Sequence, residues 1–180
     1  MELKKLSKSK IFQFILALLP FLAIGLIFSK AVFVFFMMIA TVGLAFVVLF
    51  IQPLKHIGIE LVTFTTILVG FAWGAGYGMT VGFFLLLVHL IVGRYSLSTY
   101  LAWTIPEYIV MGFLAGSLQG LGFVNIGVYL TIGMFVINMI LTFIFSNAYF
   151  FRYIPYAFGN VMFNVLMFLY LGSAVLKFAI

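Results

Sequence analysis

Apolar residues fill the chain in long continuous runs, and polar residues gather in the short stretches between these runs. Because the runs do not alternate with polar positions, and because a backbone in lipid must satisfy its own hydrogen bonds, helices are favoured over barrel strands. Helices are predicted at about 11–29, 31–51, 58–74, 78–93, 106–122, 126–146 and 157–177. The pattern therefore predicts an all-α fold, a polytopic transmembrane helical bundle. Its six-helix core (31–180) follows a basic N-terminus and first hydrophobic segment (1–30) in a single domain.

Glycine decides where one of these runs breaks. Residues 58–93 form a continuous apolar run that would measure roughly 54 Å as one helix, at about 1.5 Å per residue, whereas the hydrocarbon core is about 30 Å thick. The stretch GAGYG, from Gly74 to Gly78, is the part of this run that is richest in glycine. A tight turn between two helices is therefore predicted there.

Two glycine stripes with four-residue spacing indicate close helix packing. Such small-xxx-small patterns let two helix backbones approach each other, which matters in lipid because packing drives helix association there. The helix-packing residues are predicted to be Gly74, Gly78 and Gly82 in the first stripe and Gly112, Gly116 and Gly120 in the second.

The predicted crossings place the longer loops on one side of the membrane. Counting from segment 31–51, the connections at 52–57, 94–105 and 147–156 share one membrane face, here called face A. The opposite face, face B, carries only the short connections at 75–77 and 123–125. Binding residues concentrate in loops, so a functional site is expected at face A.

Polar side chains follow one side of each of the last two segments, at a spacing that puts them on one helix face. They are Asn138, Thr142 and Ser146 in segment 126–146, and Tyr156, Asn160 and Asn164 in segment 157–177. Both stripes begin at face A and descend side by side into the membrane. Two interpretations stay open: the stripes line a pocket, or they act as interhelical hydrogen bonds worth about 0.6 kcal/mol each.

Ionisable residues inside the apolar runs are few, and each is a functional candidate because a charge at the bilayer centre costs about 2.5–3.5 kcal/mol on insertion scales. Glu107 follows Pro106 and is expected in the first turn of its helix, where the helix dipole favours a carboxylate. Glu60 is expected in the first turn of segment 58–74. His89 lies deeper, where a hydrogen bond to a neighbouring helix is the more common role.

Composition supports a membrane protein and excludes several chemistries. Hydrophobic residues make up 67% of the chain and charged residues 7%, and the net charge of +6 comes from Lys and Arg at the ends of apolar runs, so no nucleic-acid partner is expected. Cysteine and aspartate are absent, and no hydrolytic constellation, metal-ligand spacing or phosphate loop is found. The sequence predicts a multi-pass protein of the cell (plasma) membrane that is not an enzyme and uses no cofactor or metal.

The segment GAGYGMTVG, Gly74 to Gly82, resembles the turn between the second and third helices of S components, the membrane-embedded substrate-binding subunits of energy-coupling factor (ECF) transporters. The stretch IPEYIVMGFLAGSLQG is similar to the glycine-rich fourth helix of the same family, which also follows a proline. The resemblance covers residues 31–177. The proline and lysine of the family turn are Ala75 and Gly76 here.

The resemblance implies the binding subunit of a micronutrient transporter that takes up vitamin-like solutes. It implies an outward-facing pocket closed by the loops of face A, with a membrane coupling subunit and ATPase subunits as partners, because the chain has no nucleotide motif. A small, partly aromatic or weakly charged solute is expected between the last three helices. The predicted substrate-binding residues are Trp103, Glu107, Tyr108, Asn138, Thr142, Tyr153, Tyr156, Asn160 and Asn164.

A second family is similar in its general pattern, the rod-shape-determining membrane proteins of the MreD type. This alternative implies a non-transporting scaffold in which the glycine stripes bind other helices and the polar stripes are adhesive. Members of that family usually carry an aspartate after the third-helix glycines, where this chain has Leu85 to His89.

Membrane orientation depends on the first hydrophobic segment. If 11–29 spans the bilayer, the N-terminal lysines join face A, and the excess of positive charge predicts that face A is cytoplasmic. If 11–29 re-enters or lies on the surface, face A points outward, which an importer requires. Length and hydrophobicity favour a span.

Overall fold

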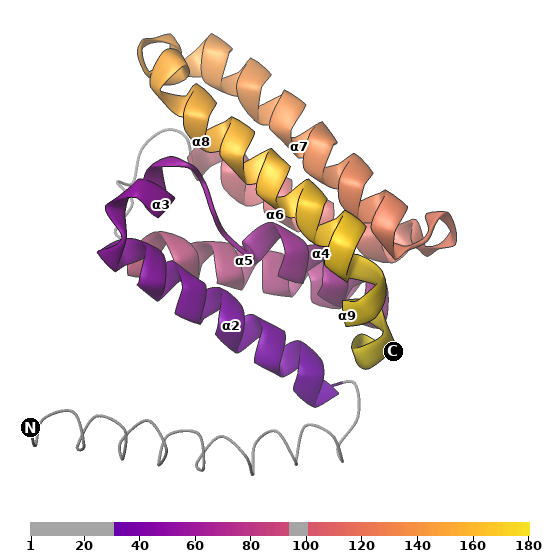
Figure 1. The fold of residues 1–180 in the computed structure, drawn as a ribbon. Helices are drawn as coiled ribbons and strands as arrows, with labels where there is room; N and C mark the ends of the chain where they lie inside the picture. The colour runs from indigo at the N-terminus through magenta and orange to yellow at the C-terminus, as the bar shows by residue number, and fades with distance from the viewer. Residues whose placement is uncertain (1–30, 94–100) are drawn as a thin grey trace, which may run out of the picture.

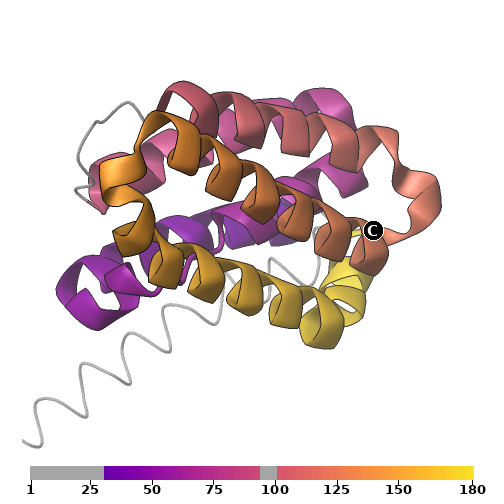
Figure 2. The same ribbon diagram turned by 90° about the horizontal axis from the view of Figure 1, so that it is seen from above.

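The computed structural model describes residues 31–93 and 101–180, and no strand occurs in these two ranges. The helices are α2 (Ala31–Phe50), α3 (Gln52–His56), α4 (Val62–Trp73), α5 (Ala75–Val92), α6 (Leu101–Ser117), α7 (Phe123–Phe145), α8 (Asn147–Leu166) and α9 (Gly172–Ala179). A 3₁₀ turn, η1 (Gln119–Leu121), precedes α7, and a π-helical stretch, η2 (Met167–Leu171), joins α8 to α9. Figures 1 and 2 show the resulting helical bundle.

The structure confirms the predicted helical bundle and its membrane character. Four of the described helices or helix runs are long and apolar enough to cross a membrane, at Val32–Phe50, Ala75–Val92, Phe123–Phe145 and Phe150–Ala179. Large apolar side chains such as Phe36, Phe143 and Tyr170 are exposed on the outer helices, as expected for a surface in contact with lipid. The predicted segment 11–29, and the orientation that depends on it, lie outside the described residues.

Helix α4 occupies the centre of the bundle. Every residue from Val62 to Gly70 is buried, the pattern of a helix that is covered on all sides. Helix α2 packs on α4 and α5, and a hydrogen bond of 2.7 Å joins the hydroxyl groups of Thr41 on α2 and Thr65 on α4. Helices α7 and α8 form an antiparallel pair on the other side of the bundle (Figure 1).

Glycines bring the backbones of α4, α5 and α6 together. Gly74, at φ +98°, is the single residue between α4 and α5, and a side chain there would be strained. A Cβ atom added to Gly78 would lie 2.6 Å from the Cα of Gly70, and one added to Gly112 would lie 2.7 Å from the amide nitrogen of Met79. Gly82 and Gly116 are similarly close to α6 and α5, respectively. Gly120 has open space around it, so it takes no part in this packing.

Helices α6 and α8 begin well before their predicted starts at 106 and 157, and each has a proline inside it. Helix α6 is helical from Leu101, so Pro106 lies in its interior and Glu107 is not in the first turn as predicted. Helix α8 begins at Asn147, with Pro155 in its interior, so the predicted loop 147–156 is wrong. Both prolines are exposed. Proline removes one backbone donor, and a membrane helix tolerates this loss.

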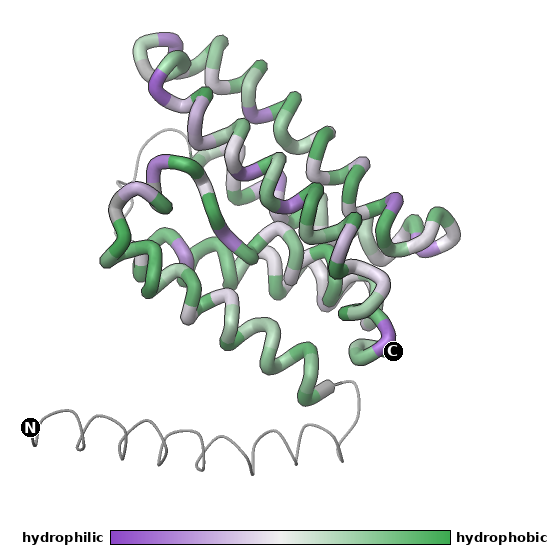
Figure 3. The backbone as a smooth tube through the Cα atoms, in the orientation of Figure 1, coloured by the Kyte–Doolittle hydropathy of each residue, from purple (hydrophilic) through white to green (hydrophobic). Residues whose placement is uncertain are grey.

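The predicted helix 58–74 begins later than expected, at Val62. The connection after α3 runs into the bundle beside α8 before α4 starts (Figure 1), and Figure 3 shows a hydrophilic position on it among hydrophobic helices. Gly58 has φ +68°, and a Cβ atom there would lie 3.0 Å from the Cβ of Asn160. The connection, residues 57–61, is therefore pressed against α8. Non-helical backbone is tolerated at membrane depth where protein covers it.

Candidate functional site

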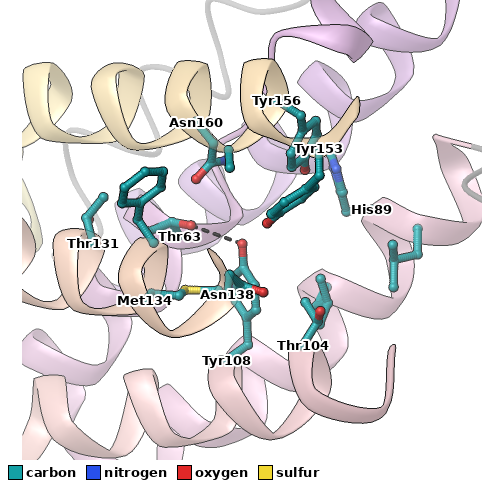
Figure 4. Close-up of a pocket in the computed structure, with 14 residues that line it drawn as sticks. Thr63, His89, Thr104, Tyr108, Thr131, Met134, Asn138, Tyr153, Tyr156 and Asn160 are labelled. Atoms are coloured by element: carbon teal, nitrogen blue, oxygen red, sulfur yellow. Dashed lines mark hydrogen bonds between the residues drawn. The ribbon is translucent and has the colours of Figure 1, made fainter. Parts of the chain in front are cut away.

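A small cavity lies between α4, α5 and α6 on one side and the α7–α8 pair on the other (Figure 4). Its volume is about 40 Å³, which is room for a few water molecules, since one water needs roughly 10–15 Å³ of such space. Polar and aromatic side chains dominate the lining: Thr63, His89, Thr104, Tyr108, Thr131, Asn138, Tyr153, Tyr156 and Asn160. Leu86, Leu90, Met134, Phe135 and Ala157 complete it.

The cavity lies toward the face A end of the bundle. Thr63 belongs to the first turn of α4, Thr104 to the first turn of α6, and His89 to the last turn of α5. Tyr153 and Tyr156 come from the first half of α8, and their rings stack with centroids 5.7 Å apart. The chain thus places polar side chains from four helices, α4, α5, α6 and α8, at the same end of the bundle.

Glu60 organises the polar stripe of α8. Its carboxylate is 2% exposed and accepts hydrogen bonds from the side-chain amides of Asn160 (2.9 Å) and Asn164 (3.1 Å). It also accepts from the backbone N–H of Thr63 (3.0 Å) and from the Thr63 hydroxyl (2.7 Å). Four donors on α4 and α8 therefore converge on one buried carboxylate. This arrangement caps α4 and ties the connection 57–61 to α8.

The hydrogen bonds around Glu60, here called the Glu60 network, extend to side chains that line the cavity. The Thr63 hydroxyl lies 3.0 Å from the Tyr108 hydroxyl on α6, a hydrogen bond drawn in Figure 4. Asn160 donates to the Gly58 carbonyl at 3.0 Å as well as to Glu60. Thr63, Tyr108 and Asn160 thus present one side to the cavity and the other to the Glu60 network.

The wall that α7 contributes to the cavity carries two polar side chains, Thr131 and Asn138. The Thr131 hydroxyl and the Asn138 side-chain carbonyl are buried, and neither atom has a hydrogen-bond partner among the described residues. The two residues are seven positions apart and so share a helix face. A buried polar atom without a partner costs about 1–3 kcal/mol, and most such atoms in proteins are paired with protein or water. An occupant of the cavity would satisfy both atoms.

A second hollow lies on the outside of the α6–α7 contact. This α6–α7 groove has a volume of about 560 Å³ and an apolar lining, in which Val110, Met111 and Leu114 of α6 face Leu130, Ile137 and Leu141 of α7. Trp103 and Glu107 belong to this groove, and the Trp103 ring lies 5.8 Å from that of Phe145. Met134 lines both hollows, so one layer of side chains separates them.

The structure divides the predicted substrate-binding residues into three groups. Five line the cavity: Tyr108, Asn138, Tyr153, Tyr156 and Asn160. Trp103 and Glu107 line the α6–α7 groove instead. Thr142 and Asn164 are buried but line neither hollow, and Asn164 donates a hydrogen bond to Glu60.

Several cavity residues were absent from the predicted set. Thr131 lies two helical turns from Asn138 on the same face, so the spacing itself offered a signal. Thr63 and Thr104 lie near helix starts and belong to no polar stripe, so the sequence does not indicate a site there. The sequence predicts Glu60 as an acid in the first turn of a helix, without its partners. Its hydrogen bonds to Asn160 and Asn164 join residues that are 100 and 104 positions apart, so no local spacing reveals them.

No protein-family model, curated protein or solved structure matches this chain. The resemblance to S components therefore depends on the quoted glycine and proline motifs, and that to MreD-type proteins on the general pattern of helices.

Proposed function

We propose that this chain is a membrane-embedded solute-binding subunit of a micronutrient uptake transporter, as its resemblance to ECF S components implies. The observation that carries the proposal is the polar cavity with two unpaired buried atoms, the Thr131 hydroxyl and the Asn138 carbonyl. Small-molecule sites combine aromatic walls with a few convergent polar groups, and this cavity has both.

The chemistry of the lining favours an uncharged polar solute with an aromatic or planar part. Tyr153, Tyr156 and Tyr108 supply aromatic surface, and the Asn138 carbonyl supplies an acceptor for an N–H or O–H group. Neither Glu60 nor Glu107 lines the cavity. The solute therefore needs no positive charge.

Solute capture requires the cavity to widen, because about 40 Å³ is too small for a vitamin-like molecule. Close backbone contacts hold α4, α5 and α6 together through glycine, and α7 packs more extensively on α8 than on α6. In the proposed mechanism the α7–α8 pair moves away from α6 together with the connection 57–61, which Glu60 ties to α8, and closes again over the solute. Aromatic packing of Phe168 against Phe64 (4.7 Å) and Phe123 (5.3 Å) anchors that pair at the end away from the cavity.

Transport requires partners in this proposal. The chain would cross the cell membrane several times and would associate with a membrane coupling subunit and a pair of ATPase subunits. Solute binding, by contrast, belongs to this chain alone and is measurable on the purified protein.

One observation favours the alternative of a scaffold of the MreD type. Asn160 and Asn164 bond to Glu60 within the chain, so part of the polar stripe is adhesive. A scaffold retains no solute, and this difference separates the two functions.

Thr131→Val tests the proposal, because valine keeps the shape of threonine and removes a hydroxyl that has no partner in the structure. A thermal-shift screen of the purified protein against a panel of vitamins and related heterocycles is expected to find a stabilising solute. A ligand at 100 times its Kd adds about 2.7 kcal/mol of stability. The variant should keep the melting temperature of the wild type without solute and lose most of the shift. If no solute shifts the wild type, the scaffold function is favoured.

A further inference from the structure

Glu107 is a half-buried acid that the proposed solute site does not use. It lies beyond the first turn of α6, so the helix dipole does not account for it. Both of its carboxylate oxygens are buried, and neither has a hydrogen-bond partner among the described residues. Glu60, which lies deeper in the bundle, has four donors. The contrast shows that the chain builds donors around one carboxylate and leaves the other without them.

The surroundings of Glu107 are apolar on the lipid side and polar on the inner side. Among the described residues, the lining of the α6–α7 groove contains no other charged side chain, and its other titratable side chain is Tyr129 on α7. The Asn138 side chain of α7 lies next to the carboxylate on its donor side, at a geometry outside that of the other hydrogen bonds in the bundle. Behind Asn138, the titratable side chains are Tyr108 on α6, His89 on α5, and Tyr153 and Tyr156 on α8. No cationic side chain among the described residues pairs with Glu107.

A carboxylate in such a place needs a neutralising cation. An isolated buried charge is among the most costly groups in a protein, and it is kept only when it is paired, neutralised or bound to a metal ion. Lone-pair oxygens are available for a hard cation: two on Glu107 and one on Asn138, whose carbonyl also lacks a partner. We propose that Glu107 and Asn138 form a binding site for a small monovalent cation, a proton or Na⁺, at the α6–α7 interface.

The site adjoins the solute cavity through Asn138, which lines that cavity and faces Glu107. Cation binding and solute binding therefore share one side chain. The cation site itself does not depend on the solute, and its test needs none.

Dicyclohexylcarbodiimide is a suitable probe because it partitions into lipid and modifies protonated carboxyl groups in apolar surroundings. The α6–α7 groove, at about 560 Å³, gives it a path to Glu107. The full chain in lipid vesicles is treated with this reagent over a range of pH, in sodium chloride or in choline chloride of equal ionic strength. Peptide mass spectrometry then compares labelling of the Glu107 peptide with that of the Glu60 peptide.

We expect Glu107 to be labelled several-fold faster than Glu60. Slower labelling in sodium than in choline identifies Na⁺ as the cation, whereas labelling that falls as pH rises and ignores sodium identifies the proton. The proposal is overturned if Glu107 is labelled no faster than Glu60, or if its labelling responds neither to sodium nor to pH. Asn138→Leu serves as a second variant, in which sodium protection is expected to weaken while Glu107 remains labelled.

Discussion

Gly112→Ala is expected to destabilise the protein by about 3 kcal/mol, at the upper end of what overpacking costs. The added methyl group would collide with the Gly78 backbone and would lie 2.7 Å from the Met79 amide nitrogen. Backbone atoms in a packed helix cannot rotate away as a side chain can, so α5 and α6 must separate. Because α5 and α6 also hold the cavity residues His89, Thr104 and Tyr108, solute binding should fall with stability.

Gly43→Ala is the matched control for this substitution. Gly43 lies inside α2, and an added Cβ would meet nothing within 4 Å. Alanine is a better helix former than glycine by up to about 1 kcal/mol, so this variant should be as stable as the wild type or more stable. Equilibrium unfolding in mixed micelles measures both variants. Equal stability of the two would show that the α5–α6 contact is looser than the structure indicates.

Glu60→Gln is expected to cost about 1–3 kcal/mol of stability, the range for a buried donor that loses its acceptor. Glutamine keeps one oxygen but replaces the other with an NH₂ group. It cannot accept from the Thr63 backbone and from the α8 amides in the present arrangement, where Thr63 N–H uses one carboxylate oxygen and both amides use the other. Glu60→Ala removes all four bonds and should cost more, about 3–5 kcal/mol by analogy with a broken buried pair.

Glu107→Gln is the same chemical change at the acid whose carboxylate oxygens make no hydrogen bond of regular geometry with the described residues. It removes a buried charge without removing a bond, so its stability should equal or exceed that of the wild type. The two Glu→Gln variants are compared by thermal unfolding in the same detergent. A loss at Glu107 as large as that at Glu60 would contradict the contrast between the two sites.

The fold was largely predictable from hydrophobic pattern, because membrane helices are long apolar runs and the bilayer limits their length. The break at Gly74 followed from length and glycine content alone. The predicted starts of α6 and α8 were wrong because of their prolines. A proline is typical of a helix start or a loop, whereas Pro106 and Pro155 lie inside these helices. The late start of α4 was not predicted, because Glu60 is also a typical residue for the first turn of a helix and Gly58 is followed directly by the apolar run.

The candidate site was predictable in part, from the spacing of polar residues along single helices. Spacing along one helix identifies a face, and on the predicted faces Asn138 and Asn164 are buried and Asn160 is partly buried. Spacing does not say which neighbour that face meets. The packing of α6, α7 and α8 decides these contacts. It brings Asn164 to Glu60, and it places Glu107 and Trp103 in the α6–α7 groove. These contacts join residues far apart in the chain and leave no local pattern.

The central claim is that α7 presents a polar face to a cavity that water and solute reach from one side of the membrane. Because the chain has no cysteine, single cysteines at Thr131 and at its neighbour Ile132 test it directly. Thr131 lines the cavity and Ile132 is exposed on the outer surface of the bundle. In vesicles, a charged, membrane-impermeant thiol reagent is expected to modify the cysteine at position 131 from one side only and to leave the one at position 132 unmodified. Equal reactivity at the two positions, or none at 131 from either side, would contradict the claim.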